Sequence, residues 1–378
     1  MSKLDELIQQ HCPDGVEYKK LGEVLSVNRG RRLTKVQLSE DGQYYVYHGS
    51  KDTPLGKYSQ FNVKGNTTIV VNTGGIGGVK FCDNDFWCSD GSFWIGHSDL
   101  FNDKFVYYYL SPLEPYFASQ KRVGGVPTID RSVVENVEIP IPPLPVQEEI
   151  VRILDTFTEL QAELQAELQK RLQQYEYYRD KLLSFSDLSN WGGQEVSVEW
   201  KKLGDICNLS RGKVYSKSYI EENAGEYPVY SSQTANNGEL GRISTYDYDG
   251  EYLTWTTDGA YAGTIFYRKG KFSITNVCGL ISIKGDNLLI KFLFYWLSIK
   301  APDYVYRGMG NPKLMSNQME PIKVPIIPLA EQQRIVDILD RFNTLTTDIT
   351  AGLPAEIEAR RKQYEYYRDQ LLTFKQKA

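Results

Sequence analysis

The chain has 378 residues, of which 41% are hydrophobic and 24% are charged, and its formal net charge is −5. This composition is typical of a globular protein and excludes a disordered one, and the length is sufficient for two domains with separate cores. No apolar run approaches the roughly 18 residues of a membrane span, and the first twenty residues lack an apolar run of signal-peptide length, so we expect a cytoplasmic protein with no membrane association.

A segment near the start of the chain is repeated in its second half. VEYKKLGEVLSVNRGRRLTK, which starts at Val16, is matched by VEWKKLGDICNLSRGKVYSK, which starts at Val198. Near the end of each half, VEIPIPPLPVQEEIVRILDTF from Val137 is matched by IKVPIIPLAEQQRIVDILDRF from Ile322. Self-similarity of this kind is the signature of repeated structural units. We therefore predict two halves with the same fold and divergent middle segments.

The middle of each half alternates β-branched and aromatic residues with Gly, Asn and Asp. This pattern covers residues 57–96 and 249–285, and it predicts short strands joined by tight turns. The segments FVYYYLSP (105–112) and FLFYWLSI (292–299) come next and are predicted to be short buried helices or strands. Each half is thus expected to be an α+β globule followed by a long helix.

The long helices are predicted from apolar periodicity. From Ile150 to Phe185 an apolar residue recurs at a mean spacing of 3.5 residues, and a similar stripe runs from Ile335 to Phe374. This spacing is typical of a coiled-coil seam, and the two stripes can bury each other, although two separate core helices are an alternative. Pro354 cannot continue a helix, so we expect a kink or break near Gly352.

The cysteines do not form a recognisable framework. Their number is odd and none lies in a C-x-x-C pair, which argues against structural disulfides and against a zinc ribbon. We interpret all five as reduced thiols: Cys12, Cys82, Cys88, Cys207 and Cys278.

The sequence contains only weak candidates for catalytic motifs. PDGVEYK (13–19) superficially offers the carboxylates and lysine of a metal-dependent nuclease, but a solvated turn explains it better. TGGIGGVKF (73–81) lacks the G-x-G-x-x-G order of a dinucleotide loop, and its counterpart TDGAYAGTIF suggests a glycine-rich turn between strands. The three histidines are isolated. A binding protein without a metal or cofactor of its own is therefore favoured over an enzyme.

Cationic loops are the candidate binding elements. They combine Arg and Lys with glycines that permit close backbone approach, which suits contacts to phosphates and base edges. The candidate DNA-binding residues are Arg29, Arg31, Arg32, Lys35, Lys121, Arg122, Arg211, Lys213, Lys217, Arg307, Asn311 and Lys313. The alternative is that these charges are ordinary solvated surface; their occurrence in both repeats favours binding.

The net negative charge differs from the basic character of most nucleic-acid-binding domains. Part of it lies in the helical segment 147–187, which has nine acidic and five basic residues, so the globules are close to neutral. A near-neutral globule attracts DNA phosphates weakly, and we expect this chain to bind DNA poorly without a partner.

The ordered duplication resembles the specificity subunit of type I restriction-modification systems over essentially the full length. The resemblance depends on the YKKLG and WKKLG openings, the junctions GGVPTIDRSVVENVEIPIPPLPVQEEI and GMGNPKLMSNQMEPIKVPIIPLAEQQRI, and the two QYEYYRD segments. It implies an α+β chain with two target recognition domains separated by two long helices in an antiparallel coiled coil. The implied domains are 1–143 and 191–328, the implied helices with their links 144–190 and 329–378.

The resemblance also implies a function. Each recognition domain would read one half of a bipartite DNA site, and the helices would set the spacer. The partners would be double-stranded DNA, two modification subunits that methylate adenine with S-adenosylmethionine, and restriction subunits. The chain itself would have no active site and would hold the duplex while a partner flips the target base. The expected docking residues on the helices are Tyr175, Tyr178, Arg179, Tyr364, Tyr367 and Arg368.

Two other functional classes are alternatives to this interpretation. A protein-only adaptor, with two repeated domains on a helical stalk, agrees with the same repeats. A standalone methyltransferase is disfavoured because the sequence has neither a nucleotide-cofactor loop nor an Asn/Asp-Pro-Pro-aromatic motif.

Overall fold

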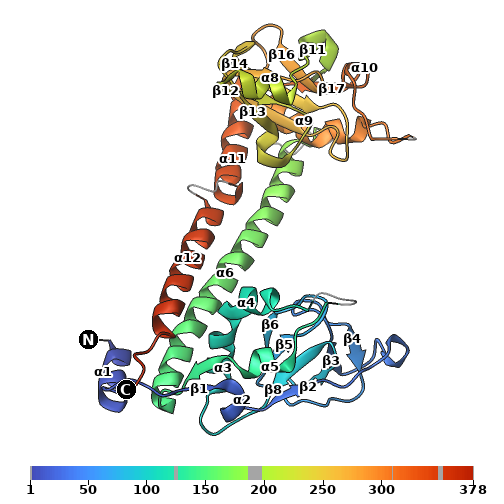
Figure 1. Ribbon diagram of the computed structural model, residues 1–378. Coiled ribbons are helices and arrows are strands. Elements are labelled where there is room, and N and C mark those ends of the chain that lie inside the picture. Colours follow the sequence, from blue (N-terminus) through green and yellow to red (C-terminus); the bar gives the residue numbers. More distant parts are fainter. Residues whose placement is uncertain (1, 123–126, 186–197, 309, 348–351, 378) are drawn as a thin grey trace. The chain divides into compact units, whose positions relative to one another are not determined.

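The computed structural model describes residues 2–122, 127–185, 198–308, 310–347 and 352–377. The chain divides into two compact units: unit 1 consists of Met1–Ala166 and Glu356–Ala378, and unit 2 of Glu167–Ala355. Figure 1 labels many of the elements of both. Among the described residues, no helix is both long enough and apolar enough to cross a bilayer.

Unit 1 contains short strands and helices followed by one long helix. In chain order the elements are α1 (Lys3–His11), β1 (Tyr18–Lys20), α2 (Leu21–Val24), β2 (Val27–Arg29), η1 (Lys35–Gln37), β3 (Tyr44–Tyr47), β4 (Gly56–Tyr58), β5 (Thr67–Val71), β6 (Val79–Cys82), β7 (Trp87–Cys88), β8 (Ser92–Ile95), α3 (Asp103–Leu110), η2 (Ser111–Leu113), α4 (Glu114–Ser119), α5 (Arg131–Glu135), β9 (Glu138–Pro140) and α6 (Leu144–Leu182). The last part of α6, from Glu167, belongs to unit 2.

Unit 2 repeats this order with longer strands. Its elements are β10 (Glu199–Lys202), α7 (Leu203–Ile206), β11 (Cys207–Arg211), α8 (Lys217–Glu222), β12 (Ala224–Tyr230), η4 (Ala235–Gly238), β13 (Glu239–Ile243), β14 (Tyr248–Thr256), β15 (Ile265–Ile274), β16 (Cys278–Ile283), α9 (Ile290–Lys300), η5 (Ala301–Tyr304), α10 (Ser316–Met319), β17 (Lys323–Ile326) and α11 (Leu329–Thr347). Helix α12 (Leu353–Leu371) returns the chain to unit 1.

The sheets of the two units correspond strand by strand. In unit 1, β2-β8-β5-β6 and β4-β3-β7 are separate sheets, whereas in unit 2 the order β11-β16-β14-β15-β12-β13 forms one sheet. Strand β15 joins the two parts, and its counterpart in unit 1 is divided into β6 and β7. The prediction of short strands is therefore wrong for β14 and β15. Gly250 and Gly270, which look like turn residues in the sequence, lie opposite each other inside this strand pair with positive φ.

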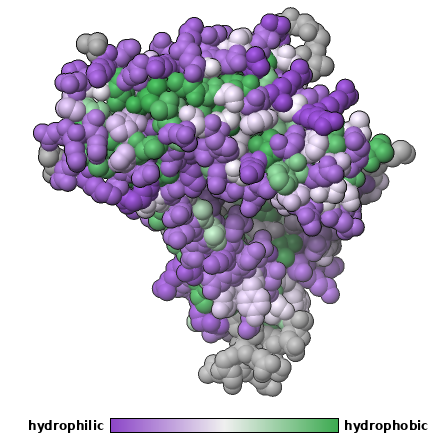
Figure 2. All heavy atoms as spheres, turned by 90° about the horizontal axis from the view of Figure 1, so that it is seen from below, coloured by the Kyte–Doolittle hydropathy of each residue, from purple (hydrophilic) through white to green (hydrophobic). Residues whose placement is uncertain are grey.

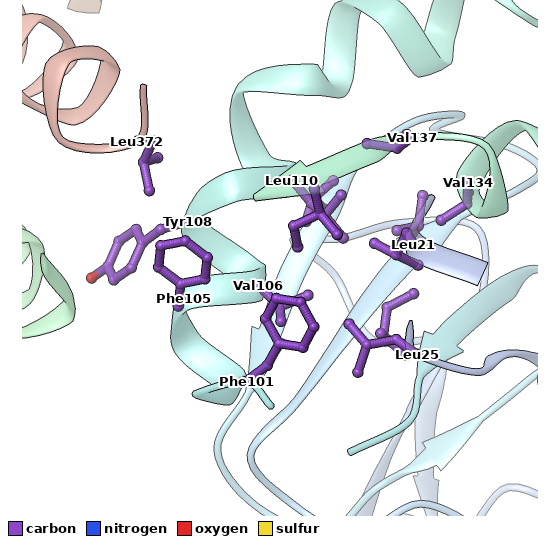
Figure 3. Close-up of a cluster of buried hydrophobic side chains, with 14 of the residues drawn as sticks. Leu21, Leu25, Phe101, Phe105, Val106, Tyr108, Leu110, Val134, Val137 and Leu372 are labelled. Atoms are coloured by element: carbon purple, nitrogen blue, oxygen red, sulfur yellow. The ribbon is translucent and has the colours of Figure 1, made fainter. Parts of the chain in front are cut away.

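The core of unit 1 lies between α3, the sheet and the long helices. Phe105, Val106 and Leu110 of α3 are buried, as the apolar run predicted, and Figure 3 shows them with Leu21 and Leu25 of the opening segment. Leu372, from the end of the chain, lies in the same core beside Tyr108. The equivalent helix α9 buries Phe292, Leu293 and Trp296 in the core of unit 2. Both segments that could have been helices or strands are helices.

The long helices pair through their apolar stripes. Helices α6 and α12 run side by side in opposite directions, and Phe157 stacks on Tyr367 with ring centroids 5.6 Å apart. In unit 2, Tyr178 of α6 stacks on Phe342 of α11 at 5.7 Å. Phe157 and Phe342 are equivalent residues of the repeat, so the same aromatic contact occurs twice. The antiparallel helix pair of the predicted fold is confirmed.

Each globule is fixed to its helix by a buried glutamine. The Gln147 side chain of α6 accepts a hydrogen bond from the Asn102 amide (2.8 Å) and donates to the carbonyl oxygens of Leu100 (2.8 Å) and Pro142 (2.7 Å). Its repeat equivalent in α11, Gln332, does the same. It accepts from the Leu289 amide (2.8 Å) and donates to the carbonyl oxygens of Asn287 (2.9 Å) and Ile327 (2.8 Å). Both glutamine side chains are fully buried.

A Lys–Asp–Tyr triplet adds a second attachment in both units. Asp155 of α6 accepts hydrogen bonds from Lys104 (2.9 Å) and Tyr108 (2.6 Å) of α3. Asp340 of α11 accepts the equivalent bonds from Lys291 (2.5 Å) and Tyr295 (2.6 Å) of α9. Burial and the aspartate neighbour raise the pKa of both tyrosine hydroxyls well above the usual value, so both remain protonated donors.

The second long helix is interrupted where Pro354 predicted. Helix α11 ends at Thr347 and α12 begins at Leu353, and residues 348–351 lie outside the described part of the chain. Pro354 occupies the first turn of α12, where a backbone N–H has no partner within the helix, so proline is tolerated there. The predicted break near Gly352 is confirmed.

The five cysteines are free thiols, as predicted, and the structure adds that all five are buried. Burial raises the pKa of the Cys82, Cys207 and Cys278 thiols to about 12, and it also raises the pKa of Cys12 and Cys88.

Hydrophilic residues dominate the molecular face in Figure 2, with hydrophobic residues in smaller patches.

Candidate functional site

Loops from four parts of unit 1 are joined by backbone hydrogen bonds. We call them loop cluster 1, which consists of residues 29–32, 48–50, 72–75 and 88–91. The bonds that link these loops to one another or to adjoining strands are, donor first, Arg31 to Cys88 (2.8 Å), Ser89 to Tyr47 (3.0 Å), Asn72 to Gly91 (3.0 Å) and Gly75 to Gly49 (2.7 Å). Gly74 has a φ of 77°, which favours glycine in this turn between β5 and β6.

Unit 2 contains the equivalent loop cluster 2, which consists of residues 211–213, 231–233, 257–259 and 275–277. Its bonds match three of those in unit 1: Lys213 to Ile274 (3.2 Å), Thr275 to Tyr230 (2.8 Å) and Thr257 to Val277 (3.4 Å). The backbone frame is thus the same in both units, while most side chains on it differ. Such an arrangement allows one fold to present two different binding surfaces.

One arginine is held in place at the same position in each cluster. The Arg29 Nε contacts the carbonyl oxygen of Asp90 at 3.4 Å, and Arg211 Nη2 donates to Thr257 Oγ1 at 3.1 Å. Both arginines end the first strand of their sheet, and both remain exposed. Their guanidinium groups therefore have a defined position and nitrogen atoms available to a ligand.

The other cations of the first loop are free of acidic partners. Arg31, Arg32 and Lys35 are exposed, and within the described residues they form no ion pair. The backbone beneath them is fixed because the carbonyl oxygen of Arg31 accepts a bond from Trp87 Nε1 (2.7 Å) and because Leu33 is buried. Positive charge is thus presented on a rigid loop.

The matching cations in unit 2 are less free. Lys213 forms an ion pair with Asp247, with Nζ and Oδ1 2.5 Å apart. Lys217 is exposed but lies apart in sequence from loop cluster 2, as the first residue of α8. The loop 211–217 therefore carries less unpaired positive charge than its counterpart.

The remaining candidates lie on two further loops. Arg122 forms an ion pair with Asp130, and Lys121 beside it is exposed; residues 123–126 of this loop lie outside the described part of the chain. In unit 2, Arg307, Asn311 and Lys313 are exposed. The backbone of Lys313 exchanges two hydrogen bonds with that of Tyr306 (2.8 and 3.0 Å).

These loops adjoin the clusters. Thr128, which pairs with Arg122, also pairs with Thr73 of loop cluster 1, and Lys313 pairs with Asp258 of loop cluster 2. Each unit therefore brings two of the predicted cationic loops to one surface.

Sequence reasoning missed the members of the clusters that are neither arginine nor lysine. The Asn72 side chain donates a hydrogen bond to the same carbonyl oxygen that Arg29 contacts, and Thr257 accepts one from Arg211. His48 accepts a hydrogen bond from the Gly91 amide (3.1 Å). Attention to the arginine loops came from their runs of Arg and Lys, and these residues are of other types. The available signal was the alignment of NTGGIGG (72–78) with TDGAYAG (257–263), which places Asn72 opposite Thr257 in the repeat.

The tyrosines among the expected docking residues contribute to the helix pairs, and two of them, Tyr178 and Tyr367, also remain 38% and 42% exposed. Tyr178 and Tyr367 stack on the facing helix, and the half-buried Tyr175 and Tyr364 contact Phe342 and Phe157. Arg179 and Arg368 form ion pairs with Asp180 (2.8 Å) and Asp369 (2.7 Å) of their own helix.

The neighbouring tyrosines are more exposed to solvent. Tyr177 and Tyr366 are 61% and 62% exposed and occupy equivalent positions of the repeat. They are the larger uncovered aromatic surfaces on these helices.

Two repeated units, each with the same loop frame and each attached to paired long helices, define a protein with one candidate binding surface per domain. A family model described as the type I restriction modification DNA specificity domain matches residues 13–174 and again residues 195–359. The two matches cover most of the chain, which therefore belongs to the family of type I restriction-modification specificity subunits.

Relatives and solved structures agree with this assignment. A putative type I specificity subunit of Mycoplasma pneumoniae is 45% identical over 237 residues, which are 63% of this chain and 93% of the relative. A putative type I restriction enzyme specificity subunit of Haemophilus influenzae is 31% identical over 95% of this chain and 96% of its own length. The crystal structure of a type I S subunit from M. genitalium has a TM-score of 0.63 at 20% identity and covers 94% of this chain and 95% of that one, which shows a common fold.

Proposed function

We propose that each unit reads one half of a bipartite DNA sequence through its loop cluster. The proposal is supported by the observation that one hydrogen-bonded loop frame occurs twice and presents a positioned arginine each time, Arg29 and Arg211. The side chains around these arginines differ between the units, which would let the two half-sites differ in sequence.

In this proposal the chain recognises DNA and leaves the chemistry to its partners. Two modification subunits would bind S-adenosylmethionine and methylate adenine, and restriction subunits would join the same assembly. Family membership supports these partners and favours this role over a protein-only adaptor. The near-neutral globules agree with a chain that depends on partners for part of its DNA affinity.

We further propose that the modification subunits dock on the long helices at Tyr177 and Tyr366. Exposed aromatic side chains are enriched at protein interfaces, and these two are repeated in equivalent positions. Two equivalent sites would suit two copies of one partner. The buried faces of Tyr178 and Tyr367 would hold the helices together beneath the docking sites.

The proposal is tested by reconstituting the chain with the methyltransferase subunits of its own genome and sequencing the DNA that the complex modifies. We expect adenine methylation at a single bipartite motif, with one base set for each unit. A continuous motif, or an active methyltransferase whose sites are unaffected by this chain, would contradict the assignment of one half-site to each unit.

The long helices are proposed to set the spacer between the half-sites. Helix α6 contains the tandem repeat QAELQAEL at 161–168 and carries residues of both units. Deleting Gln165–Leu168 removes ~6 Å of helix and slightly more than one turn, so the apolar stripe is largely kept. We expect the spacer to shorten by about one or two base pairs, since the duplex rises ~3.4 Å per step. Mapping of the methylated sites measures the length of the spacer directly.

A length-preserving variant controls for the helix itself. Gln165→Ala with Glu167→Ala changes the same segment without shortening it, and its spacer should remain that of the unaltered protein. The interruption between α11 and α12 can absorb part of the change in the deletion. An active deletion variant that keeps the original spacer, or changes its half-site bases, would refute the role of the helix in spacing.

A further inference from the structure

The two loop clusters share a backbone frame but differ in charge at one equivalent position. Arg31 donates its backbone N–H to Cys88, and Lys213 donates its own to Ile274, the residue equivalent to Cys88. Both are exposed cations at the same place in the frame. Arg31 forms no ion pair with the described residues, whereas Lys213 is paired with Asp247.

Asp247 has an uncharged counterpart in unit 1. Its backbone N–H donates to Phe272 (3.1 Å), as the N–H of Asn62 donates to the equivalent Phe86 (3.2 Å). The Asn62 side chain exchanges hydrogen bonds with the Cys88 backbone at 3.0 and 2.7 Å. The position of Asp247 is therefore occupied in unit 1 by an amide that bonds to the backbone, whereas in unit 2 it is a carboxylate that bonds to Lys213.

Asp247 is held firmly in this place. Its carboxylate is 17% exposed and accepts a second hydrogen bond from Tyr215 (2.5 Å), while its backbone N–H also lies 3.1 Å from Ser273 Oγ. Burial raises the pKa of this carboxyl, but the hydrogen bonds from Lys213 and Tyr215 outweigh burial and leave the pKa below its usual value. It is therefore charged under ordinary conditions.

A DNA phosphate near Lys213 would meet a neutral ion pair instead of a free cation. If Lys213 left Asp247 for the phosphate, a largely buried carboxylate would lose its counter-ion, and its negative charge would repel the phosphate. Arg31 has no such competitor among the described residues and can release a DNA counter-ion in full.

We propose that Asp247 withholds Lys213 from the DNA backbone, so that loop cluster 1 supplies more phosphate contacts than loop cluster 2. Asp247 acts as a positioning residue through Lys213, and the two half-sites are bound with unequal electrostatic contributions. Unit 2 then depends relatively more on contacts to the bases. This inference rests on the proposed role of both clusters in DNA binding.

The test is the salt dependence of DNA binding by the complex with its methyltransferase subunits. Each phosphate contact contributes about 0.9 to the slope of log K against log [salt]. Arg31→Met should make the slope shallower by about 0.9, whereas Lys213→Met should leave it unchanged. Asp247→Asn, which installs the amide of unit 1, should make the slope steeper by about 0.9 and tighten binding roughly five- to tenfold at ~0.1 M salt.

Two further variants separate this explanation from others. Adding Lys213→Met to Asp247→Asn should restore the original slope, because the gain depends on the freed lysine. Glu251→Gln is the matched control: it removes a carboxylate from an ion pair in unit 2 whose lysine, Lys269, is 71% exposed, against 72% for Lys213. It should change the slope by less than half as much as Asp247→Asn.

The outcomes are distinct. A shallower slope for Lys213→Met in the otherwise unaltered protein would overturn the proposal, because the lysine would then contact phosphate despite Asp247. Loss of binding only at the cognate site in Asp247→Asn would also overturn it and would indicate that the carboxylate contacts a base. If Asp247→Asn does not fold, the comparison of Arg31→Met with Lys213→Met decides alone. If the unaltered complex has no sequence-specific binding, it is the proposed function that fails.

Discussion

Replacing Arg29, Arg31 and Arg32 with glutamine is expected to weaken binding of the assembled complex to its DNA site by on the order of 1–3 kcal/mol for each arginine that binds DNA. The loop backbone should keep its conformation, because Trp87 Nε1 and the buried Leu33 fix it independently of the arginine side chains. Methylation at limiting enzyme and a binding titration at fixed salt measure the effect. The first half-site should lose its preference, while the bases of the second remain selected.

Arg211→Gln provides the reciprocal experiment in unit 2. It removes the positioned arginine beside Thr257, and the weakening should be confined to the second half-site. Lys64→Gln, an exposed lysine of unit 1 outside loop cluster 1, is the control and should leave methylation unaffected. Normal methylation in both arginine variants would show that these loops are surface without a role in recognition.

Replacing Gln147 or Gln332 with leucine is expected to lower the free energy of unfolding of its unit by about 3 kcal/mol or more. Each substitution leaves one N–H and two carbonyl groups without the side-chain partner that they have in the buried junction. Urea unfolding would measure the loss of free energy. Hydrogen exchange would locate the destabilised region, which should be unit 1 for Gln147→Leu and unit 2 for Gln332→Leu.

Gln333→Leu is the matched control for this pair. Gln333 follows Gln332 in α11, is exposed and bonds only to Asp337 of its own helix among the described residues, so the change in stability should stay within about 0.5 kcal/mol. Equal stability of Gln332→Leu and Gln333→Leu would contradict the anchoring role of the buried glutamine.

The parts of the fold that follow from local pattern could be predicted from the sequence. Apolar periodicity indicated the long helices, and Pro354 indicated the interruption between α11 and α12. The repeat itself also held the signal for the glutamine anchor, because Gln147 and Gln332 occupy matching positions in PLPVQEEI and PLAEQQRI. The sequence alone did not indicate a buried anchor, because glutamine is ordinarily a surface residue.

The candidate site was predictable only in part. Charge identified the arginine loops, but the contact between Lys213 and Asp247 joins residues 34 positions apart and depends on the path of β15. Strand length was mispredicted for a related reason: Gly250 and Gly270 each resemble a turn residue, and only their pairing across two strands shows that they lie within a sheet. Long-range pairing of this kind leaves no local pattern.

Because all five natural thiols are buried, cysteines introduced on the surface can be labelled selectively with spectroscopic dyes. A maleimide dye reacts with exposed thiolates, and the native cysteines are buried with raised pKa values, so they should remain unlabelled in the folded protein. Val36 and Val214 are 95% and 78% exposed on the two cationic loops. Cysteines at these two positions would carry a donor and an acceptor dye, and energy transfer between them would report how far apart the two loops stand before and after DNA is bound.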